Sequence, residues 1–138
     1  MTGVTRPEDM SPALAEAFNA ADLDAVMALY EPQAVLVDET GQPHAGIEAI
    51  RTALAELLTG GGTMTSRPRF AIVAGDVAVS SAAWQLETVA ANGETVQATG
   101  CSLEILRRQA NGRWRYAIDC PAGQIATTTA RPSSWAVV

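Results

Sequence analysis

FNAADLDAVMALYEPQAVLVDETGQPHAGIEAIRTALAELL, residues 18–58, is the stretch that decides the fold. Apolar side chains first recur there at helical intervals, which predicts an amphipathic helix that Pro32 ends. These side chains are Leu23, Val26, Met27 and Tyr30. The apolar run AVLV at 34–37 is typical of a short strand, and Asp38 opens the turn that ends it. Helical spacing then returns over residues 46–58 and stops at a run of glycines.

The rest of the chain adds a helix before this stretch and long strands after it. Pro7 can start a first helix, which ends near Asn19. Beyond the glycine run, β-branched segments are separated by Gly-Asp and Asn-Gly pairs that are typical of hairpin turns. The predicted strands are Thr65–Ala74, Val77–Val89, Glu94–Arg108 and Arg113–Cys120. This order predicts an α+β fold in which a strongly curved antiparallel sheet closes over the N-terminal helices and leaves a cavity.

Length and charge limit the kinds of partner. The 138 residues suit one domain, which we expect to span residues 1–123. Residues 124–138 are rich in Ser, Thr and Ala without periodicity, and we expect a loosely ordered extension there. A formal net charge of −6, with only nine Lys and Arg residues, argues against nucleic-acid binding. Small molecules or other proteins are the expected partners.

The sequence also bears on location and on cofactors. Charged residues stand at positions 6–9, where a secretory signal needs an apolar run. No apolar run reaches the roughly 18 residues of a membrane-spanning helix, so we expect a cytoplasmic protein without membrane contact. Cys101 and Cys120 are then reduced thiols that lack metal-binding spacing. Neither a metal nor a cofactor is expected.

Four segments together resemble a known superfamily. They are FNAADLDAVMALYEPQAVLVDETG (18–41), GIEAIRTALAELL (46–58), SLEILRRQANGRWRYAIDCPAG (102–123) and the predicted hairpin between the last two. They are similar to the NTF2-like superfamily, which includes ketosteroid isomerase and SnoaL-type cyclases, and within it to the DUF4440 (SgcJ-type) branch. The resemblance covers roughly residues 8–123 and implies a cone-shaped α+β fold with helices in the concave face of the sheet. It is distributed along the chain, so it indicates the fold more strongly than the reaction.

The resemblance also implies roles for individual residues. Asp38 falls where the isomerases keep their proton-shuttling aspartate. Glu104 falls close to the protonated aspartic acid that donates a hydrogen bond in those enzymes, and a shift of one or two residues would place Ser102 there instead. Leu14 stands where the isomerases have a tyrosine, which argues against a steroid isomerase because one donor of the oxyanion hole is missing.

The last predicted hairpin turns around the Asn-Gly pair at 111–112. The length of its loop determines which side chains of the two strands lie on the same face of the sheet. A two-residue turn places Glu104 opposite Asp119. A four-residue loop places Glu104 opposite Ala117 and Asp119 opposite Ser102. In both cases Ser102, Glu104 and Asp119 share one face of the sheet. A three-residue loop with a glycine bulge would break this equivalence.

The other face of the hairpin is apolar. Leu103, Ile105 and Ile118 lie there, and we expect this outer surface of the sheet to form a homodimer. By the same parity, Trp114 and Tyr116 lie on the face away from Asp119, in packing or at the dimer surface.

Three carboxylates are the candidate catalytic residues: Asp38, Glu104 and Asp119. If they converge in the cone, burial and mutual repulsion raise their pKa values, and one carboxyl can stay protonated near neutral pH. An acid beside a base suits proton transfer next to a carbonyl, or epoxide opening, without a cofactor. The candidate ligand-contacting residues are Leu14, Tyr30, Trp84 and Ser102. Trp84 would lie against the ligand, and Tyr30 would be a core residue with its hydroxyl at the edge.

Each of these assignments has a structural alternative. Asp38 can close a turn by accepting local N–H groups, and Asp119 can cap a strand end. Glu104 can pair with one of the nearby arginines. Trp84 can be an ordinary core residue. His44, the only histidine, is assigned to the surface.

Two functions follow from the sequence. The first is a cofactor-free acid–base enzyme, an isomerase or a SnoaL-type cyclase or hydrolase, acting on an apolar polyketide- or steroid-like molecule. The second is a non-catalytic ligand-binding or association domain that uses the same cavity.

Overall fold

The computed structural model describes residues 3–123, so the predicted extension at 124–138 lies outside the described residues. The helical elements are η1 (Pro7–Asp9), α1 (Met10–Asn19), α2 (Leu23–Met27) and α3 (Ile47–Thr59). The strands are β1 (Tyr30–Val37), β2 (Pro43–Ala45), β3 (Thr63–Ala74), β4 (Val77–Val89), β5 (Thr95–Cys101), β6 (Leu103–Arg108) and β7 (Trp114–Cys120). No helix among these is long and apolar enough to cross a bilayer.

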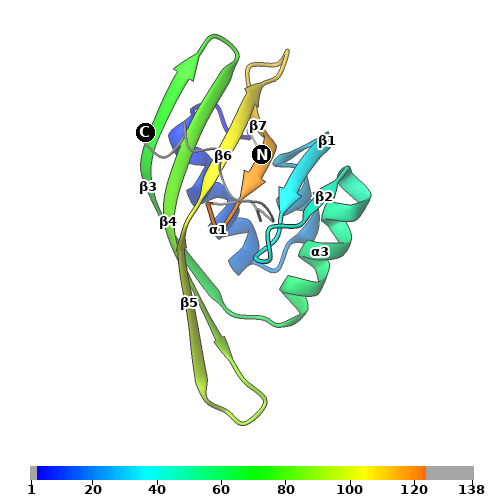
Figure 1. Cartoon of the computed structure of the whole chain (residues 1–138), viewed down its shortest axis with the longest axis vertical. Helices are drawn as coiled ribbons and strands as arrows, with labels where there is room; N and C mark the ends of the chain where they lie inside the picture. The colour runs from blue at the N-terminus through cyan, green and yellow to red at the C-terminus, as the bar shows by residue number, and fades with distance from the viewer. Residues whose placement is uncertain (1–2, 124–138) are drawn as a thin grey trace, which may run out of the picture.

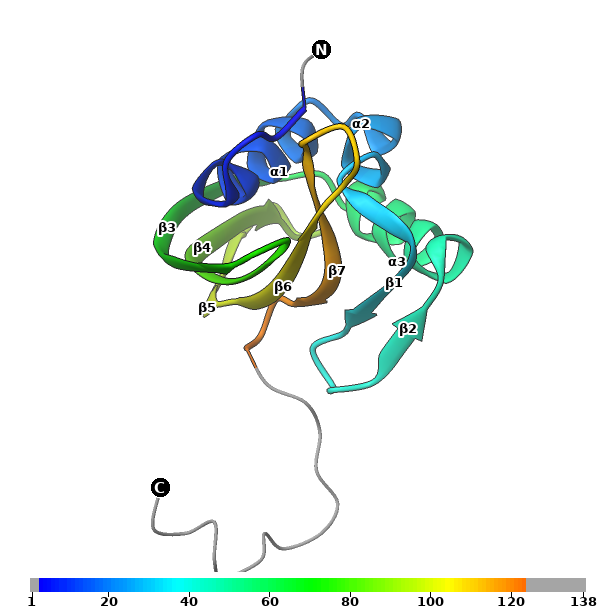
Figure 2. The same cartoon turned by 90° about the horizontal axis from the view of Figure 1, so that it is seen from above.

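The strands form one curved sheet that wraps around the first helix. Its order is β2-β1-β7-β6-β4-β3, and β5 pairs with the far end of β4 (Figure 1). β1 runs parallel to β7, and the other pairs are antiparallel. Seen from above, α1 lies across the concave side of the sheet, and α3 lies beside β1 and β2 (Figure 2). The predicted α+β architecture, with helices in the concave face of a strongly curved sheet, is confirmed.

The second helix ends earlier than its apolar spacing predicts. Asp22 caps it by accepting a hydrogen bond from the Ala25 amide, and it ends at Met27. Tyr30 is therefore the first residue of β1 rather than a helical residue. Pro32 lies inside this strand, where the register against β7 shifts, because proline has no N–H to give to the ladder.

The segment predicted as one strand from Glu94 to Arg108 is two strands that bend at Ser102. β5 pairs with residues 83–89 of β4, whereas β6 pairs with residues 77–80. At the bend, the Ser102 hydroxyl accepts a hydrogen bond from the Ala82 amide at 3.0 Å. The sheet can therefore curve sharply here without leaving that amide unpaired.

Two irregularities offset each other in the last hairpin. The Gln109 amide donates to the Arg113 carbonyl at 2.7 Å, which leaves residues 110–112 as a three-residue loop. This is the loop length that would have separated the two acidic residues. A bulge then leaves Ala117 without a cross-strand partner, since Leu106 faces Tyr116 and Ile105 faces Ile118. The register that follows places Glu104 opposite Asp119.

Because of this bulge, the predicted face of Tyr116 was wrong. Tyr116 was predicted on the face away from Asp119, but both side chains are buried on the concave side. Trp114 is also buried, in the core between the sheet and the helices. Leu103 and Ile118 do lie on the outer face, where each is 40% exposed. The dimer that this face suggested stays a prediction.

Candidate functional site

The concave side of the sheet holds a cavity of about 510 Å³. This volume lies within the range of ordinary small-molecule sites, and the walls are mainly apolar. All the residues predicted to bind or transform a ligand lie in its wall: Leu14, Tyr30, Asp38, Trp84, Ser102, Glu104 and Asp119. The structure therefore brings these side chains to one cavity, and their roles remain predictions.

Glu104 and Asp119 form a buried carboxyl pair on neighbouring strands. Their exposed fractions are 3% and 4%. The Ser80 hydroxyl donates to Oε1 of Glu104 at 3.1 Å. The Tyr30 hydroxyl donates to Oδ2 of Asp119 at 2.6 Å. Both carboxyls thus reach the cavity from the sheet side, and each has a hydroxyl donor on one oxygen.

The structure contradicts the structural alternatives for these two residues, which were an ion pair of Glu104 with an arginine and a strand-end cap by Asp119. Among residues 3–123, no arginine lies within ion-pair distance of Glu104, because Arg107 pairs with Glu31 and Arg108 with Asp76. Asp119 does not cap its own strand end; its hydrogen bond goes to a tyrosine 89 positions away in the sequence. Neither carboxyl is explained by a local structural role.

Two polar atoms in the cavity wall are buried without a hydrogen-bond partner in the described part of the chain. They are Oε2 of Glu104 and the hydroxyl oxygen of Ser11. Leaving a buried polar atom without a hydrogen-bond partner costs about 1–3 kcal/mol, so these two atoms are places where a polar group of a ligand would be stabilised. Ser11 was not predicted, although it precedes Leu14 by one helical turn and shares its face.

Burial sets the protonation of the pair. Burial, followed by the nearby charge of Asp119, raises the pKa of Glu104 to about 7. Burial also raises the pKa of Asp119 to about 6, against the opposing effect of the Tyr30 hydrogen bond. Burial raises the pKa values of Tyr30 and Tyr116 well above the usual range, so both hydroxyls stay neutral. Glu104 therefore keeps its proton to higher pH than Asp119, and it is partly protonated near neutral pH.

Removing the Tyr30 hydroxyl should make Asp119 harder to ionise. We expect Tyr30→Phe to raise the pKa of Asp119 by about one to two units, because a hydrogen bond to a charged group is worth about 1.5–3 kcal/mol. Carboxyl ¹³C NMR titration measures this. Tyr116→Phe is the matched control, since Tyr116 packs beside Tyr30 at 4.8 Å between ring centroids. An unchanged titration of Asp119 in Tyr30→Phe would contradict the role of this bond.

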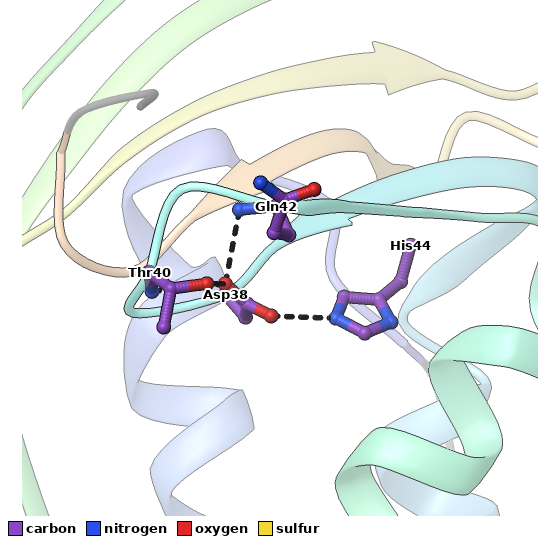
Figure 3. Close-up of polar contacts among 4 residues, drawn as sticks. All are labelled: Asp38, Thr40, Gln42 and His44. Atoms are coloured by element: carbon purple, nitrogen blue, oxygen red, sulfur yellow. Dashed lines mark hydrogen bonds and ion pairs between the residues drawn. The ribbon is translucent and has the colours of Figure 1, made fainter. Parts of the chain in front are cut away.

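Asp38 is held by the turn that follows β1. Its Oδ1 accepts hydrogen bonds from the Thr40 amide at 2.9 Å, the Thr40 hydroxyl at 2.6 Å and the Gln42 amide at 3.0 Å (Figure 3). Its Oδ2 lies 2.9 Å from Nε2 of His44 (Figure 3). The turn-closing alternative for Asp38 is thus confirmed.

The electrostatics of Asp38 differ from the prediction. The Thr40 hydroxyl, followed by His44 and the Gln42 amide, lowers the pKa of Asp38 far below its usual value. The expected rise was wrong because donors surround this carboxylate and outweigh its desolvation. A carboxylate stabilised in this way is a weak base, so its predicted role as the proton acceptor loses its physical basis.

His44, which was assigned to the surface, is only partly exposed. It lies on β2, directly opposite Leu36 of β1. Its side chain is 34% exposed and lines the same cavity as the carboxyl pair. β2 spans only Pro43–Ala45, too short for a period-two pattern to reveal it.

Trp84 closes one side of the cavity. Its indole N–H donates to the Pro121 carbonyl at 2.7 Å. Its ring packs on Gly100 of β5, where an added Cβ would lie 2.6 Å from the ring. Because Gly100 has no side chain, the indole of Trp84 on β4 can lie directly over the neighbouring strand β5.

This close approach gives a stability prediction. We expect Gly100→Ala to lower the free energy of unfolding by about 1–3 kcal/mol, because the methyl group overlaps the indole. Chemical denaturation measures it. In a Trp84→Leu background the same change should cost much less, since the overlapping ring atoms are gone. Equal costs in both backgrounds would contradict the packing account.

The described residues also include groups that can bind metals or react as thiols. Within residues 3–123, no three His, Cys, Asp or Glu side chains gather closely enough to hold a metal ion. Cys101 is exposed, Cys120 is buried, and both are free thiols.

Comparison with known proteins supports the fold. A ketosteroid isomerase-like protein from Erwinia carotovora atroseptica is 26% identical, with a TM-score of 0.74 over 82% of this chain and 89% of that one. A candidate calcium/calmodulin-dependent protein kinase type II association domain from Thiobacillus denitrificans is 20% identical, with a TM-score of 0.70 over 86% and 97%. An NTF2-like superfamily protein from Salmonella enterica is 19% identical, with a TM-score of 0.71 over 89% and 91%.

The family assignment comes from a separate match. A search of curated proteins gave no match. The model of the SnoaL-like domain family matches residues 13–117, which is most of the sequence. The cavity, the curved sheet and this match agree, and the chain belongs to the SnoaL-like domain family.

Proposed function

We propose that the cavity binds an apolar small molecule with a carbonyl oxygen and moves a proton at the carbon beside that carbonyl, without a cofactor. The observation that carries this proposal is Oε2 of Glu104, which is buried in an apolar cavity without a partner in the described residues. In its acid form, Glu104 can donate a hydrogen bond from this oxygen. A ligand carbonyl can supply the acceptor for this hydrogen bond.

The carboxyl pair can stabilise the charge that develops on the ligand. As a carbon–hydrogen bond beside the carbonyl breaks, negative charge moves to the carbonyl oxygen, and a donor already placed there stabilises the enolate. Glu104 at a pKa of about 7 is a matched donor near neutral pH. Asp119 keeps its charge because Tyr30 donates to it, so the proton of the pair stays on Glu104.

The shape of the substrate follows from the walls. Leu14, Phe18 and Trp84 offer apolar surface, which suits a fused-ring compound of the polyketide or steroid kind. Leu14 also occupies the position where a helix tyrosine would donate to the ligand oxygen. Of the predicted donors, Glu104 is then the one that donates a hydrogen bond to the ligand oxygen on which negative charge develops. This favours a ligand whose oxygen lies close to the sheet.

A second candidate function is a non-catalytic binding or association domain. Leu14 in place of a tyrosine supports it, as does the likeness in fold to a candidate kinase association domain. In that case residues 1–123 act as one cytoplasmic domain that forms a homodimer through the outer face of the sheet. We also propose that the chain belongs to the DUF4440 branch.

Deuterium exchange with a model ketone separates the two functions. The probe is 2-tetralone, a rigid apolar ketone whose acidic protons lie beside its carbonyl. In D₂O near pH 7, an acid–base site should speed the loss of these protons in ¹H NMR above the buffer rate. Binding of the ketone, seen as shifted tryptophan fluorescence, with exchange at the buffer rate would favour the binding domain.

A further inference from the structure

The turn between β1 and β2 builds a histidine–aspartate pair at the wall of the cavity. Oδ2 of Asp38 lies 2.9 Å from Nε2 of His44 (Figure 3). Asp38 cannot rotate away easily, because Oδ1 is fixed by the Thr40 and Gln42 groups. Both residues of the pair line the cavity that holds Glu104 and Asp119.

We propose that His44 is the proton acceptor of this cavity and that Asp38 is its positioning residue. An ionised carboxylate only accepts hydrogen bonds, so Nε2 of His44 must carry the hydrogen that faces Asp38. In the neutral ring Nδ1 then has the free lone pair. No hydrogen bond engages Nδ1 in the described residues, and the side chain is 34% exposed, so a ligand can reach it.

The pair completes the chemistry proposed above and rests on that proposed function. Nδ1 of His44 takes the proton from the carbon beside the carbonyl, and the electron pair of that bond forms the enolate. Glu104 stabilises the enolate oxygen. The imidazolium that forms faces the Asp38 carboxylate, which stabilises its charge, and it then returns the proton to the ligand or to water.

The first test uses the protein without any ligand. His44 is the only histidine of the sequence, so ¹⁵N-histidine labelling gives one set of ring signals. In the neutral ring, reached by raising the pH, we expect hydrogen on Nε2 and none on Nδ1. Hydrogen on Nδ1 of the neutral ring would overturn the proposal, because the free lone pair would then face Asp38.

The second test measures the rate at which the protein removes a proton from a synthetic probe, 5-nitrobenzisoxazole. A base removes its C3 proton, the electron pair forms a nitrile, the N–O bond breaks, and a coloured phenolate is released. We expect His44→Gln to lower kcat/KM about 10²-fold. Gln33→Ala is the control, because it changes an exposed side chain on β1 that does not line the cavity, and it should keep the wild-type rate. Imidazole added to His44→Ala should restore part of the rate, which a purely structural role would not allow.

The outcomes separate this inference from the proposed function. Equal rates in wild type and His44→Gln would overturn the role of His44, even if Glu104→Gln is slow. A slow His44→Gln with an unaffected Glu104→Gln would support the base and contradict the carboxyl donor. Asp38→Asn should reduce kcat rather than raise KM, since it misorients the ring without filling the cavity. An Asp38→Asn variant that matches wild type would remove Asp38 from the mechanism.

Discussion

Replacing Glu104 with glutamine should lower the protein-catalysed rate of deuterium exchange into 2-tetralone by about 10²-fold or more. Glutamine keeps the shape of the side chain and can still accept from Ser80, but it has no acidic proton to strengthen as the enolate forms. The measurement is the decay of the α-proton signals in D₂O, at matched protein concentration. Circular dichroism of the variant shows whether the fold is kept.

The control for this experiment is Glu94→Gln, the same chemical change at an exposed position in the turn between β4 and β5. It should exchange the ketone at the wild-type rate. A folded Glu104→Gln variant that also keeps the wild-type rate would contradict the proposed donor. A loss of exchange in both variants would show that net charge, and not the cavity, governs the reaction.

The same substitution should stabilise the protein at high pH. The pKa of Glu104 rises from 4.5 in the unfolded chain to about 7 in the fold, so the folded protein binds more protons between these values. The free energy of unfolding therefore falls as the pH rises through this range, and the full loss is present above about pH 7. Asp119, with a pKa raised to about 6, adds a loss of the same sign at slightly lower pH.

Glu104→Gln removes the larger part of this dependence. At pH 8 we expect the variant to be more stable than wild type by about 3 kcal/mol, because no charge has to be buried. At pH 4 the two proteins should be nearly equal. Urea denaturation at a series of pH values measures the difference, with Glu94→Gln again as the control. A variant that is less stable than wild type at pH 8 would mean that the ionised carboxylate stabilises the fold.

Most of the fold could be predicted from apolar spacing and turn residues. α3, β4 and the first helix lie close to their predicted bounds, since long periodic segments carry a strong signal. Tyr30 was misassigned because its spacing from Met27 fits a helix, whereas packing against Tyr116 and β7 makes it the start of a strand. Tertiary contacts overrode the local pattern there.

The carboxyl pair was predicted for a reason that is only partly right. Glu104 and Asp119 do face each other, but the loop has the length that would separate them, and the bulge at Ala117 restores the register. Nothing in the local sequence marks this bulge. It places Tyr116 and Asp119 on the same concave face, so it depends on packing between strands that are distant in the chain.

The predictions for Asp38 and His44 differ from the structure for a common reason. The position of Asp38 after a strand was predicted, but its pKa depends on the three-dimensional path of the Thr40 and Gln42 backbone. His44 joins it only because β2 folds back beside β1. A hairpin this short leaves no periodic signal, so neither the pairing nor the base could be found from spacing alone.

The protonation of Glu104 at neutral pH is the central claim, and it can be measured directly. The measurement is a ¹³C NMR titration of the glutamate carboxyls, with the Glu104 signal assigned by its absence in Glu104→Gln. The structure predicts that this carboxyl titrates near pH 7. A midpoint near the ordinary value of 4.5 would show a carboxylate that is ionised at neutral pH, and the proposed donor would then be absent.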